Sequence, residues 1–295
     1  MILIDYSQIA ISNIAVQLAM SKDKMTLSIP IVRHMILNSI RGLVHRFKQD
    51  YPGDVIIAVD GPAPWRRDIF PHYKAKRREG RDESKTDWES VFGLIHIIKE
   101  EIRDNFHYKV VQLDNVEADD IIAVLCKKEQ TGVNIAKNEK ILIISGDKDF
   151  QQLQKYPSVS QYAPIQKKMI ETQNPQEYIF EHIMRGDTSD GIPNFLSPDD
   201  TFVNKIKQKP IQKKKLSYWI DTLMKGEDPK TFCNEYHYRN YQRNQRLIDF
   251  DYIPDDMEED IYNTYKNIKV QSKQKILPYL INNDLKELIG KIEEF

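Results

Sequence analysis

The sequence predicts an α/β fold, with a central, mostly parallel sheet flanked by helices and followed by a smaller helical domain. Three short apolar runs each lead into aspartates, and helical stretches separate the runs, which is the alternation typical of parallel strands. The runs are Ile2–Ile4 before Asp5, Val55–Val59 before Asp60, and Ile141–Ile144 before Asp147 and Asp149. Ligands bind at the carboxyl ends of such strands, so we expect carboxylates from distant parts of the chain to meet in one crevice.

The elements of the first third of the chain follow from hydrophobic spacing and capping signals. Apolar residues at helical spacing predict a helix near 31–48, and the second strand covers 55–60. A basic, irregular stretch comes next, which we call the basic segment (Trp65–Lys85). Thr86 and Glu89 then form the pattern of a capping box, which predicts the start of a helix with one apolar face.

Strands and helices continue to alternate up to about residue 175. We expect a third strand at Tyr108–Leu113, a helix from Val116 through Lys128, a fourth strand at Ile141–Ser145, a short helix at Phe150–Lys155, and one or two edge strands within Val159–Ile170. From about residue 176 the chain is rich in Lys, Gln, Asn and Tyr and is punctuated by proline, and we predict that it is helical. The expected domains are therefore 1–180 and 181–295.

Composition excludes several classes of protein. The chain has 295 residues, of which 40% are hydrophobic and 29% charged, with a formal net charge of -1. No apolar run approaches the roughly 20 residues of a membrane span, and the N-terminus lacks the pattern of a signal peptide, so we expect a cytoplasmic protein. Cys126 and Cys233 are far apart, and the histidines form no zinc-binding pair. The sequence contains no glycine-rich phosphate loop, which argues against nucleotide-cofactor chemistry.

Acidic residues cluster in a pattern that predicts metal binding. Asp147 and Asp149 flank Lys148 directly after a strand, where both side chains can face one crevice. Glu117 and Asp120 are three positions apart, as are Asp187 and Asp190, and this spacing places each pair on one side of a helix or turn. The candidate metal ligands are Asp5, Asp60, Glu117, Asp119, Asp120, Asp147, Asp149, Asp187 and Asp190.

These carboxylates favour a phosphodiesterase that uses hard cations. Magnesium prefers octahedral oxygen coordination and retains several waters, so it needs few direct ligands. Two such ions about 4 Å apart can activate a water and stabilise the leaving oxygen of an in-line displacement. The sequence therefore predicts two Mg²⁺ ions, for which Mn²⁺ should substitute.

At the level of motifs the chain resembles the 5′-nuclease superfamily of flap endonucleases and bacterial polymerase-associated 5′ exonucleases, and in particular its phage branch. The resemblance spans nearly the whole chain. It is carried by Leu3–Ala10 (LIDYSQIA), Trp65–Asp68 (WRRD), Glu117–Asp120 (EADD), Ser145–Phe150 (SGDKDF), Gly186–Asp190 (GDTSD) and Leu247–Pro254 (LIDFDYIP).

The resemblance implies a fold and an activity. The fold would be a PIN-like catalytic domain with an arch at about residues 65–85, followed by a helical C-terminal domain that contributes late acids and duplex contacts. The activity would be magnesium-dependent hydrolysis of phosphodiesters from 5′ ends, on RNA–DNA hybrids and on duplexes with nicks, gaps or flaps. The phage branch removes RNA primers during DNA replication. The implied protein is a monomer in the host cytoplasm, with no membrane role, and its candidate partners are a single-strand-binding protein and a sliding clamp.

The resemblance also assigns the metal ligands to two sites. The first ion would involve Asp5, Asp60, Glu117 and Asp119, with Asp147 in or near its shell. The second would draw on Asp147, Asp149, Asp187 and Asp190. Asp120 matches an acidic position of the bacterial and phage members.

The basic segment has the composition of a single-strand track. Residues 66–81 contain seven basic and two acidic residues, interleaved with aromatic rings, so cations can hold phosphates while rings stack on bases. By the resemblance, Lys74 and Arg77 contact the scissile phosphate and act in catalysis. The expected substrate-binding residues are Tyr73, Arg66, Arg67 and Arg78.

A second basic run, from Lys205 to Lys215, contains no acid and fits either duplex-backbone contacts or a solubilising patch. Many relatives carry a glycine-rich helix-hairpin-helix just before this point, which often binds potassium. This chain has Asn194–Asp200 instead, so the resemblance does not extend to a potassium site.

Two other functions fit parts of the pattern. One is a structure-specific DNA-binding module without catalytic activity, against which the full set of carboxylates argues. The other is a PIN-type ribonuclease that acts on free RNA and shares the acidic parallel sheet. The basic segment and the second domain favour the 5′ nuclease.

Overall fold

In the computed structural model, residues 1–21, 27–131 and 139–295 are described, and the side chain of Arg78 lies outside that description. One six-stranded sheet has the order β3-β2-β1-β4-β5-β6. Five strands are parallel, and β6 runs antiparallel to β5. The strands are β1 (Ile2–Asp5), β2 (Val55–Ala58), β3 (Lys109–Val111), β4 (Ile141–Ile144), β5 (Val159–Ala163) and β6 (Lys168–Ile170). The predicted fold class is confirmed, including the two strands at the edge.

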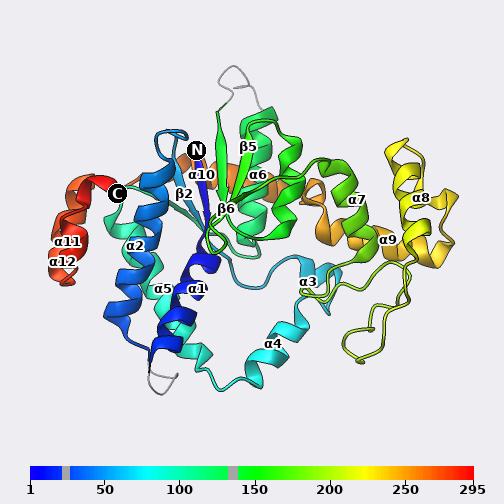
Figure 1. Ribbon diagram of the computed structural model, residues 1–295, viewed down its shortest axis with the longest axis horizontal. Coiled ribbons are helices and arrows are strands. Elements are labelled where there is room, and N and C mark those ends of the chain that lie inside the picture. The colour runs from blue at the N-terminus through cyan, green and yellow to red at the C-terminus, as the bar shows by residue number, and fades with distance from the viewer. Residues whose placement is uncertain (22–26, 132–138) are drawn as a thin grey trace.

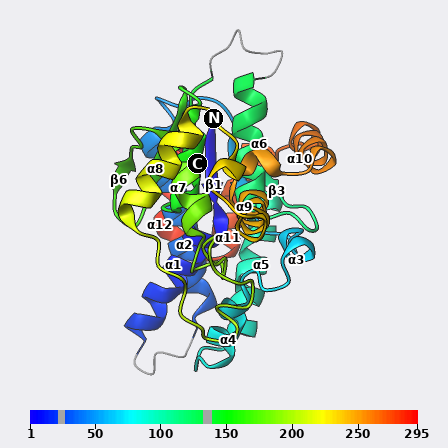
Figure 2. The ribbon, with the colours of Figure 1, turned by 90° about the vertical axis from the view of Figure 1, so that its right-hand side faces the viewer.

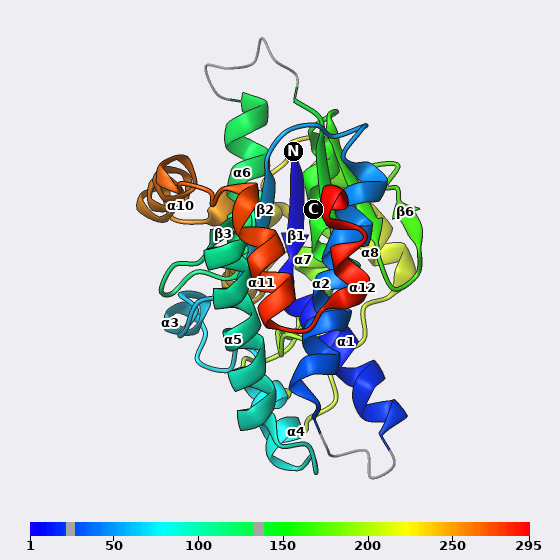
Figure 3. The same ribbon diagram turned by 90° about the vertical axis from the view of Figure 1, so that its left-hand side faces the viewer.

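Helices cover both faces of the sheet, which explains why every residue of β1, β2 and β4 is buried. On one face lie α1 (Tyr6–Met20), α2 (Ile29–Phe47), α5 (Trp88–Asn105), α11 (Ile276–Asn282) and α12 (Lys286–Ile289), as Figure 3 shows. The other face packs against α6 (Ala118–Thr131) and α10 (Asp255–Asn267), which stand together in Figure 2. The helices cover the two faces of the sheet and leave the carboxyl ends of the strands uncovered.

The basic segment is more ordered than the sequence indicates. It contains two short helices, α3 (Arg66–Ile69) and α4 (Ala75–Asp82), so the expectation of an irregular stretch is wrong. Lys74 precedes α4 with a φ of 55°, and this left-handed residue turns the chain into the helix. Figure 1 shows α3 and α4 in cyan beyond the carboxyl ends of the strands, before the chain returns through α5. The basic segment therefore passes across the carboxyl ends of the strands, where the strand-end carboxylates lie.

Two further details near the N-terminus differ from expectation. Helix α1 was not predicted, and the helix expected at 31–48 is α2. The residue that caps α5 is Asp87, whose carboxylate accepts a hydrogen bond from the backbone N–H of Ser90 at 3.1 Å. The predicted capping box with Thr86 as the cap is therefore wrong by one residue.

The C-terminal region is helical, as predicted, but only part of it stands apart from the sheet. A third apolar cluster joins α7 (Pro175–Arg185), α8 (Lys213–Met224) and α9 (Glu235–Ile248) to the rings of Phe70 and Tyr73. The later helices return to the sheet. Short 3₁₀ helices lie at η2 (Lys148–Lys155), η3 (Pro229–Thr231), η4 (Phe250–Tyr252), η5 (Lys273–Lys275) and η6 (Ile292–Glu294). Within the described ranges, none of the helices has the length and apolar character needed to cross a membrane.

Candidate active site

The strand-end aspartates meet at the carboxyl edge of the sheet. Ser145 connects two of them, since its hydroxyl donates to Asp5 Oδ2 at 3.0 Å and accepts from the backbone N–H of Asp147 at 3.1 Å. Asp60 accepts from the Ser7 hydroxyl at 2.6 Å and from the backbone N–H of Ala118 at 2.9 Å. The ends of β1, β2 and β4 and the start of α6 are thus tied together by hydrogen bonds.

These carboxylates repel one another when they are charged. Burial and the negative charge of Asp60 raise the pKa of Asp5 to about 7. Burial also raises the pKa of Asp119 well above its usual value, and the charges of Asp147 and Asp5 add to this effect although Lys74 opposes it. The pKa of Asp147 is raised by burial and by its neighbour Asp149. A bound cation relieves this repulsion, so these carboxyl groups should lose their protons when a metal ion binds.

A second group lies around the turn that follows α7. Asp149, His182 and Asp187 each offer a ligand atom within 4.8 Å of the others. His182 Nε2 is 2.9 Å from Asp149 Oδ1, and Lys148 Nζ is 3.0 Å from Asp187 Oδ2. Burial alone would raise the pKa of Asp187, but hydrogen bonds from Ser189 and Lys148 lower it to about 2. This group contains two of the predicted acids and one histidine that sequence reasoning missed.

Two glycines with positive φ shape this turn: Gly186 directly before it and Gly191, with a φ of 73°, within it. Gly186 ends α7 with a φ of 66°, which a residue with a side chain adopts only at a cost. Asp187 and Ile192 then pair through two backbone hydrogen bonds of 2.8 and 2.7 Å. This pairing folds the chain back, with Asp187 at the base of the turn and Asp190 within it.

The cations of the basic segment contact the remaining acids. Lys74 Nζ lies 2.6 Å from Glu117 Oε1 and 3.7 Å from Asp190 Oδ2. Arg77 pairs with Asp190 Oδ1 at 2.5 Å. The Tyr73 hydroxyl donates to Glu117 Oε2 at 3.0 Å. Burial would raise the pKa of Glu117, but Lys74 and Arg66 hold it below its usual value, so this acid is charged at neutral pH.

Two predicted site residues, Arg66 and Asp120, are buried and paired with each other. Arg66 is only 2% exposed, and its guanidinium contacts Asp120 at 2.7 Å, Glu117 at 3.0 Å and the carbonyl of Leu247 at 2.9 Å. Its guanidinium is occupied by these internal partners, so the structure gives no support to its assignment to substrate binding, which stays a prediction. Asp120 is fully buried, accepts from Trp65 Nε1 at 3.1 Å and pairs with Arg66, so it orients that arginine, and its assignment as a metal ligand stays a prediction.

The aromatic rings of the basic segment are buried and do not form the predicted stacking surface for bases. Tyr73 is 3% exposed and packs with Phe70 in the third apolar cluster, while Trp65 packs in the second. A buried ring has no free face for a base, so these aromatics anchor the segment to the protein. Arg67 is exposed on α3, and its contact with substrate stays a prediction. Arg78 lies on α4, but its side chain is outside the described part of the chain.

His182 gives the first testable prediction. Its imidazole lies 2.9 Å from Asp149, so replacing it with glutamine should raise the concentration of divalent metal needed for half-maximal rate in the predicted phosphodiester hydrolysis by about 10- to 100-fold. Excess metal should restore most of the rate. The exposed His107, at the amino end of β3, is the matched control, because H107Q should leave the metal dependence unchanged. A rate that stays low in excess metal would contradict the role of His182 in positioning the acids.

This geometry defines a class of protein: a parallel sheet whose strand-end carboxylates face a basic segment, as in a metal-dependent nuclease. The chain belongs to the 5′-3′ exonuclease family. The model of its N-terminal, resolvase-like domain matches residues 2–182, and the model described as T4 RNase H, C terminal, matches residues 174–295. The resemblance to the 5′-nuclease superfamily is confirmed, and the chain is a metal-dependent 5′ nuclease.

Two curated relatives fit this assignment. The chain is 35% identical to ribonuclease H of Enterobacteria phage T4 over 297 residues, which cover 99% of this chain and 95% of the phage protein. It is 26% identical over 172 residues to DNA polymerase I of Bacillus caldotenax, covering 54% of this chain and 17% of the polymerase.

Solved structures show the same fold. A bacteriophage T5 D15 flap endonuclease, in a pseudo-enzyme-product complex with DNA and metal ions, matches with a TM-score of 0.58 and 15% identity over 90% of this chain and 99% of that one. A T5 5′-exonuclease with bound zinc matches with a TM-score of 0.59 and 15% identity over 91% and 98% of the two chains. At this identity the likeness concerns the fold.

Proposed function

We propose that the chain is a magnesium-dependent 5′-to-3′ exonuclease and flap endonuclease that cleaves RNA–DNA and DNA–DNA duplexes and removes RNA primers in phage DNA replication. The observation that carries this proposal is the meeting of buried, mutually repelling aspartates beside the cations of the basic segment. Oxygen donors with raised pKa values suit a hard divalent ion. Ribonuclease H of phage T4, at 35% identity over nearly the whole chain, supports the same activity.

The residues divide between two ions. Asp5, Asp60, Glu117 and Asp119, with Asp147 in or near the shell, would hold the first. Asp147, Asp149, Asp187 and Asp190 would hold the second, and His182 would orient Asp149. When bound, the ions supply activation of the attacking water and stabilisation of the leaving oxygen.

The chain's own cations would act on the phosphate. Lys74 and Arg77 lie within ion-pair distance of Glu117 and Asp190, so they can bind non-bridging oxygens of a phosphate placed beside those acids. Their positive charge offsets the charge that builds on the phosphoryl oxygens in the transition state. Arg66 and Asp120 act indirectly, because they hold Glu117 in place.

Cleavage of labelled duplexes tests the function. Purified protein with Mg²⁺ should release 5′-phosphorylated products from the 5′ side of nicked and flapped duplexes, and EDTA should stop the reaction. Binding that is insensitive to EDTA, without cleavage, would support the idle DNA-binding module instead. Equal cleavage of structureless RNA and of duplex ends would support the PIN-type ribonuclease on free RNA.

Charge repulsion in the Asp5 cluster predicts an effect on stability. Because the pKa of Asp5 is raised on folding to about 7, this group stabilises the fold at low pH and loses that contribution as the pH rises through 7. In EDTA at pH 8, D5N should therefore be more stable than the wild type by about 1–3 kcal/mol. The difference should shrink as the pH falls from 7 towards 4, because only near pH 4 does the wild-type carboxyl become neutral in the unfolded chain as well.

Thermal unfolding checks this prediction. Mg²⁺ should raise the Tm of the wild type by mass action and should raise that of D5N much less. An unfolding temperature of D5N below that of the wild type in EDTA at pH 8 would show that the Asp5 charge does not destabilise the folded chain. The domain boundary near 180, a monomeric state, the host-cytoplasmic location and contacts with a single-strand-binding protein or sliding clamp stay predictions.

A further inference from the structure

A cavity of ≈ 440 Å³ lies between the start of the basic segment and helix α9. Its walls carry Arg239, Arg243 and Arg246, and its floor is formed by Ile69, Pro71 and His72. We call it the α3–α9 cavity. None of these residues belongs to the metal-binding acids or to the cations that contact them.

The walls of the cavity are positively charged. The three arginines follow one another at intervals of four and three residues, so they share one face of α9. One carboxylate faces them: Asp199 accepts from both terminal nitrogens of Arg239, at 2.7 and 2.6 Å, and pairs with Arg243. Three guanidinium groups against one carboxylate leave two positive charges in excess.

Arg246 carries one of these unneutralised charges. Its side chain is exposed, and it makes no ion pair or hydrogen bond with the described residues of the chain. A guanidinium group presents several N–H donors in a plane, which matches the oxygens of a phosphate. Arg246 is therefore available to an anionic ligand without the loss of any internal contact.

The cavity adjoins the proposed site of cleavage. His72, on its floor, precedes Lys74 by two residues, so their Cα atoms are at most about 7.6 Å apart. The backbone N–H of Lys74 donates to the carbonyl of Asp190 at 2.7 Å. On the opposite wall, Arg243 donates to the carbonyl of Pro193 at 2.9 Å. The start of the basic segment and α9 are thus both bonded to the chain at residues 190–193, which includes Asp190.

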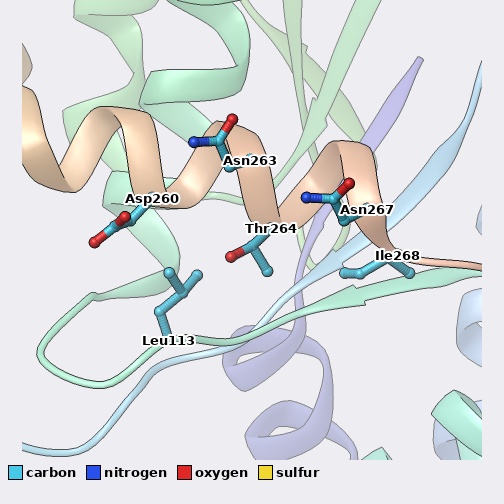
Figure 4. Close-up of a pocket in the computed structure, with 6 residues that line it drawn as sticks. All are labelled: Leu113, Asp260, Asn263, Thr264, Asn267 and Ile268. Atoms are coloured by element: carbon cyan, nitrogen blue, oxygen red, sulfur yellow. The ribbon is translucent and has the colours of Figure 1, made fainter.

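The size and lining of the cavity suit one nucleotide unit. Its volume falls in the range of small-ligand sites, about 300–1,000 Å³. Ile69 and Pro71 offer an apolar surface to a sugar or base, while the arginines face the phosphate. A hollow of similar size on α10 has amide, hydroxyl and carboxylate side chains and lacks cations among its lining residues, as Figure 4 shows.

We propose that the α3–α9 cavity binds the unpaired nucleotide on the 5′ side of the scissile bond, through the phosphodiester next to the one that is cut. This inference rests on the proposed function and adds to it a subsite for the 5′ strand. The phosphate would lie against Arg246, with Arg239 and Arg243 adding positive charge from the same wall. The subsite would hold the single strand of a flap after it has left the duplex.

The test combines a protein change with a change of substrate charge. The cleavage position of the wild type is first mapped on a flapped duplex. In a second flap, the two linkages on the 5′ side of that position are made as neutral methylphosphonates. In a third, the two linkages on its 3′ side are neutral. R246A is compared with the wild type on all three, and R103A, which removes a partly exposed arginine paired with Glu100 at the end of α5, is the control.

R246A should raise KM on the all-phosphate flap by about 10-fold, with little change in the single-turnover rate. The same change should alter KM less than about 2-fold on the flap with neutral 5′ linkages, because the charge that Arg246 contacts has gone. It should still raise KM by about 10-fold on the flap with neutral 3′ linkages. R103A should behave as the wild type throughout.

Two results would overturn the proposal. An R246A effect that vanishes with neutral 3′ linkages would place Arg246 on the duplex backbone, and no effect on any substrate would exclude a contact at all. Failure of the proposed function is distinguishable, since the wild type would then not cleave the all-phosphate flap.

Discussion

Replacement of Asp147 by asparagine should lower kcat by at least about 10³-fold, which corresponds to about 4 kcal/mol of transition-state stabilisation. Asp147 lies at the junction of the two proposed ions: it connects to Asp5 through Ser145, and Asp149 raises its pKa. Loss of its charge would weaken both metal positions. Asparagine keeps one oxygen but has no negative charge to offer a cation.

The fold of this variant should be intact. Asp147 caps η2 by accepting the backbone N–H of Asp149 at 2.9 Å, and the asparagine oxygen can accept the same bond. Its thermal unfolding temperature in EDTA should equal or exceed that of the wild type, because a repelling charge has been removed.

Asp249 provides a matched control. It caps η4 by accepting the N–H of Asp251 at 3.0 Å, and burial raises its pKa, but it lies outside the site. D249N should therefore keep its activity. The measurement is the single-turnover cleavage rate of both variants in saturating Mg²⁺. Activity of D147N within a few-fold of the wild type would remove Asp147 from the metal site.

The strands and the gathering of the acids at their ends were accessible from the sequence. Strands β1, β2 and β4 are buried on both faces, so the apolar run of each is continuous and its end is marked by the first carboxylate. Helix α1 was missed for a related reason. It is apolar on most sides, with Ile9 and Ile14 buried but Ile11 and Val16 exposed at 39% and 51%, so no single apolar face defines it.

The partners within the site could not be predicted from local patterns. The local sequence predicts that Arg66 is a surface cation. In the folded chain Glu117 and Asp120, which are more than fifty residues away in sequence, contact its guanidinium. A charged side chain is buried only with such compensation, and the chain must fold before the compensation exists. His182 follows the same logic, since it belongs to no zinc spacing and meets Asp149 only across the fold.

The aromatic rings and the cations of the basic segment have separate roles. The rings of Phe70 and Tyr73 pack in the third apolar cluster, and the buried Arg66 holds Glu117 in place. The later cations Lys74 and Arg77 pair with Glu117 and Asp190. The segment is therefore held firmly at its start by packing and ion pairs. The packed start of the segment restricts the movement of Lys74, and a group that acts on a phosphate must be held in a fixed position.

Replacement of Lys74 by alanine should lower the single-turnover rate by about 10²-fold and weaken substrate binding by only about 3-fold. The ammonium group sits between Glu117 and Asp190, so a phosphate held beside those acids meets its charge in the transition state. The variant should fold, because Glu117 keeps Arg66 and Asp190 keeps Arg77 as partners. Binding should change less than the rate, since many other contacts share the affinity for a duplex.

Lys76 tests whether position or charge alone matters. It lies two residues further along the basic segment, is exposed, and stacks over the Phe202 ring at 4.5 Å. K76A removes the same charge, so it should match K74A in binding, measured with Ca²⁺ in place of Mg²⁺, but should cleave at nearly the wild-type rate. If K74A instead lost affinity while its single-turnover rate stayed unchanged, Lys74 would be a binding residue, and the charge offset at the scissile phosphate would have to come from Arg77 and the metal ions.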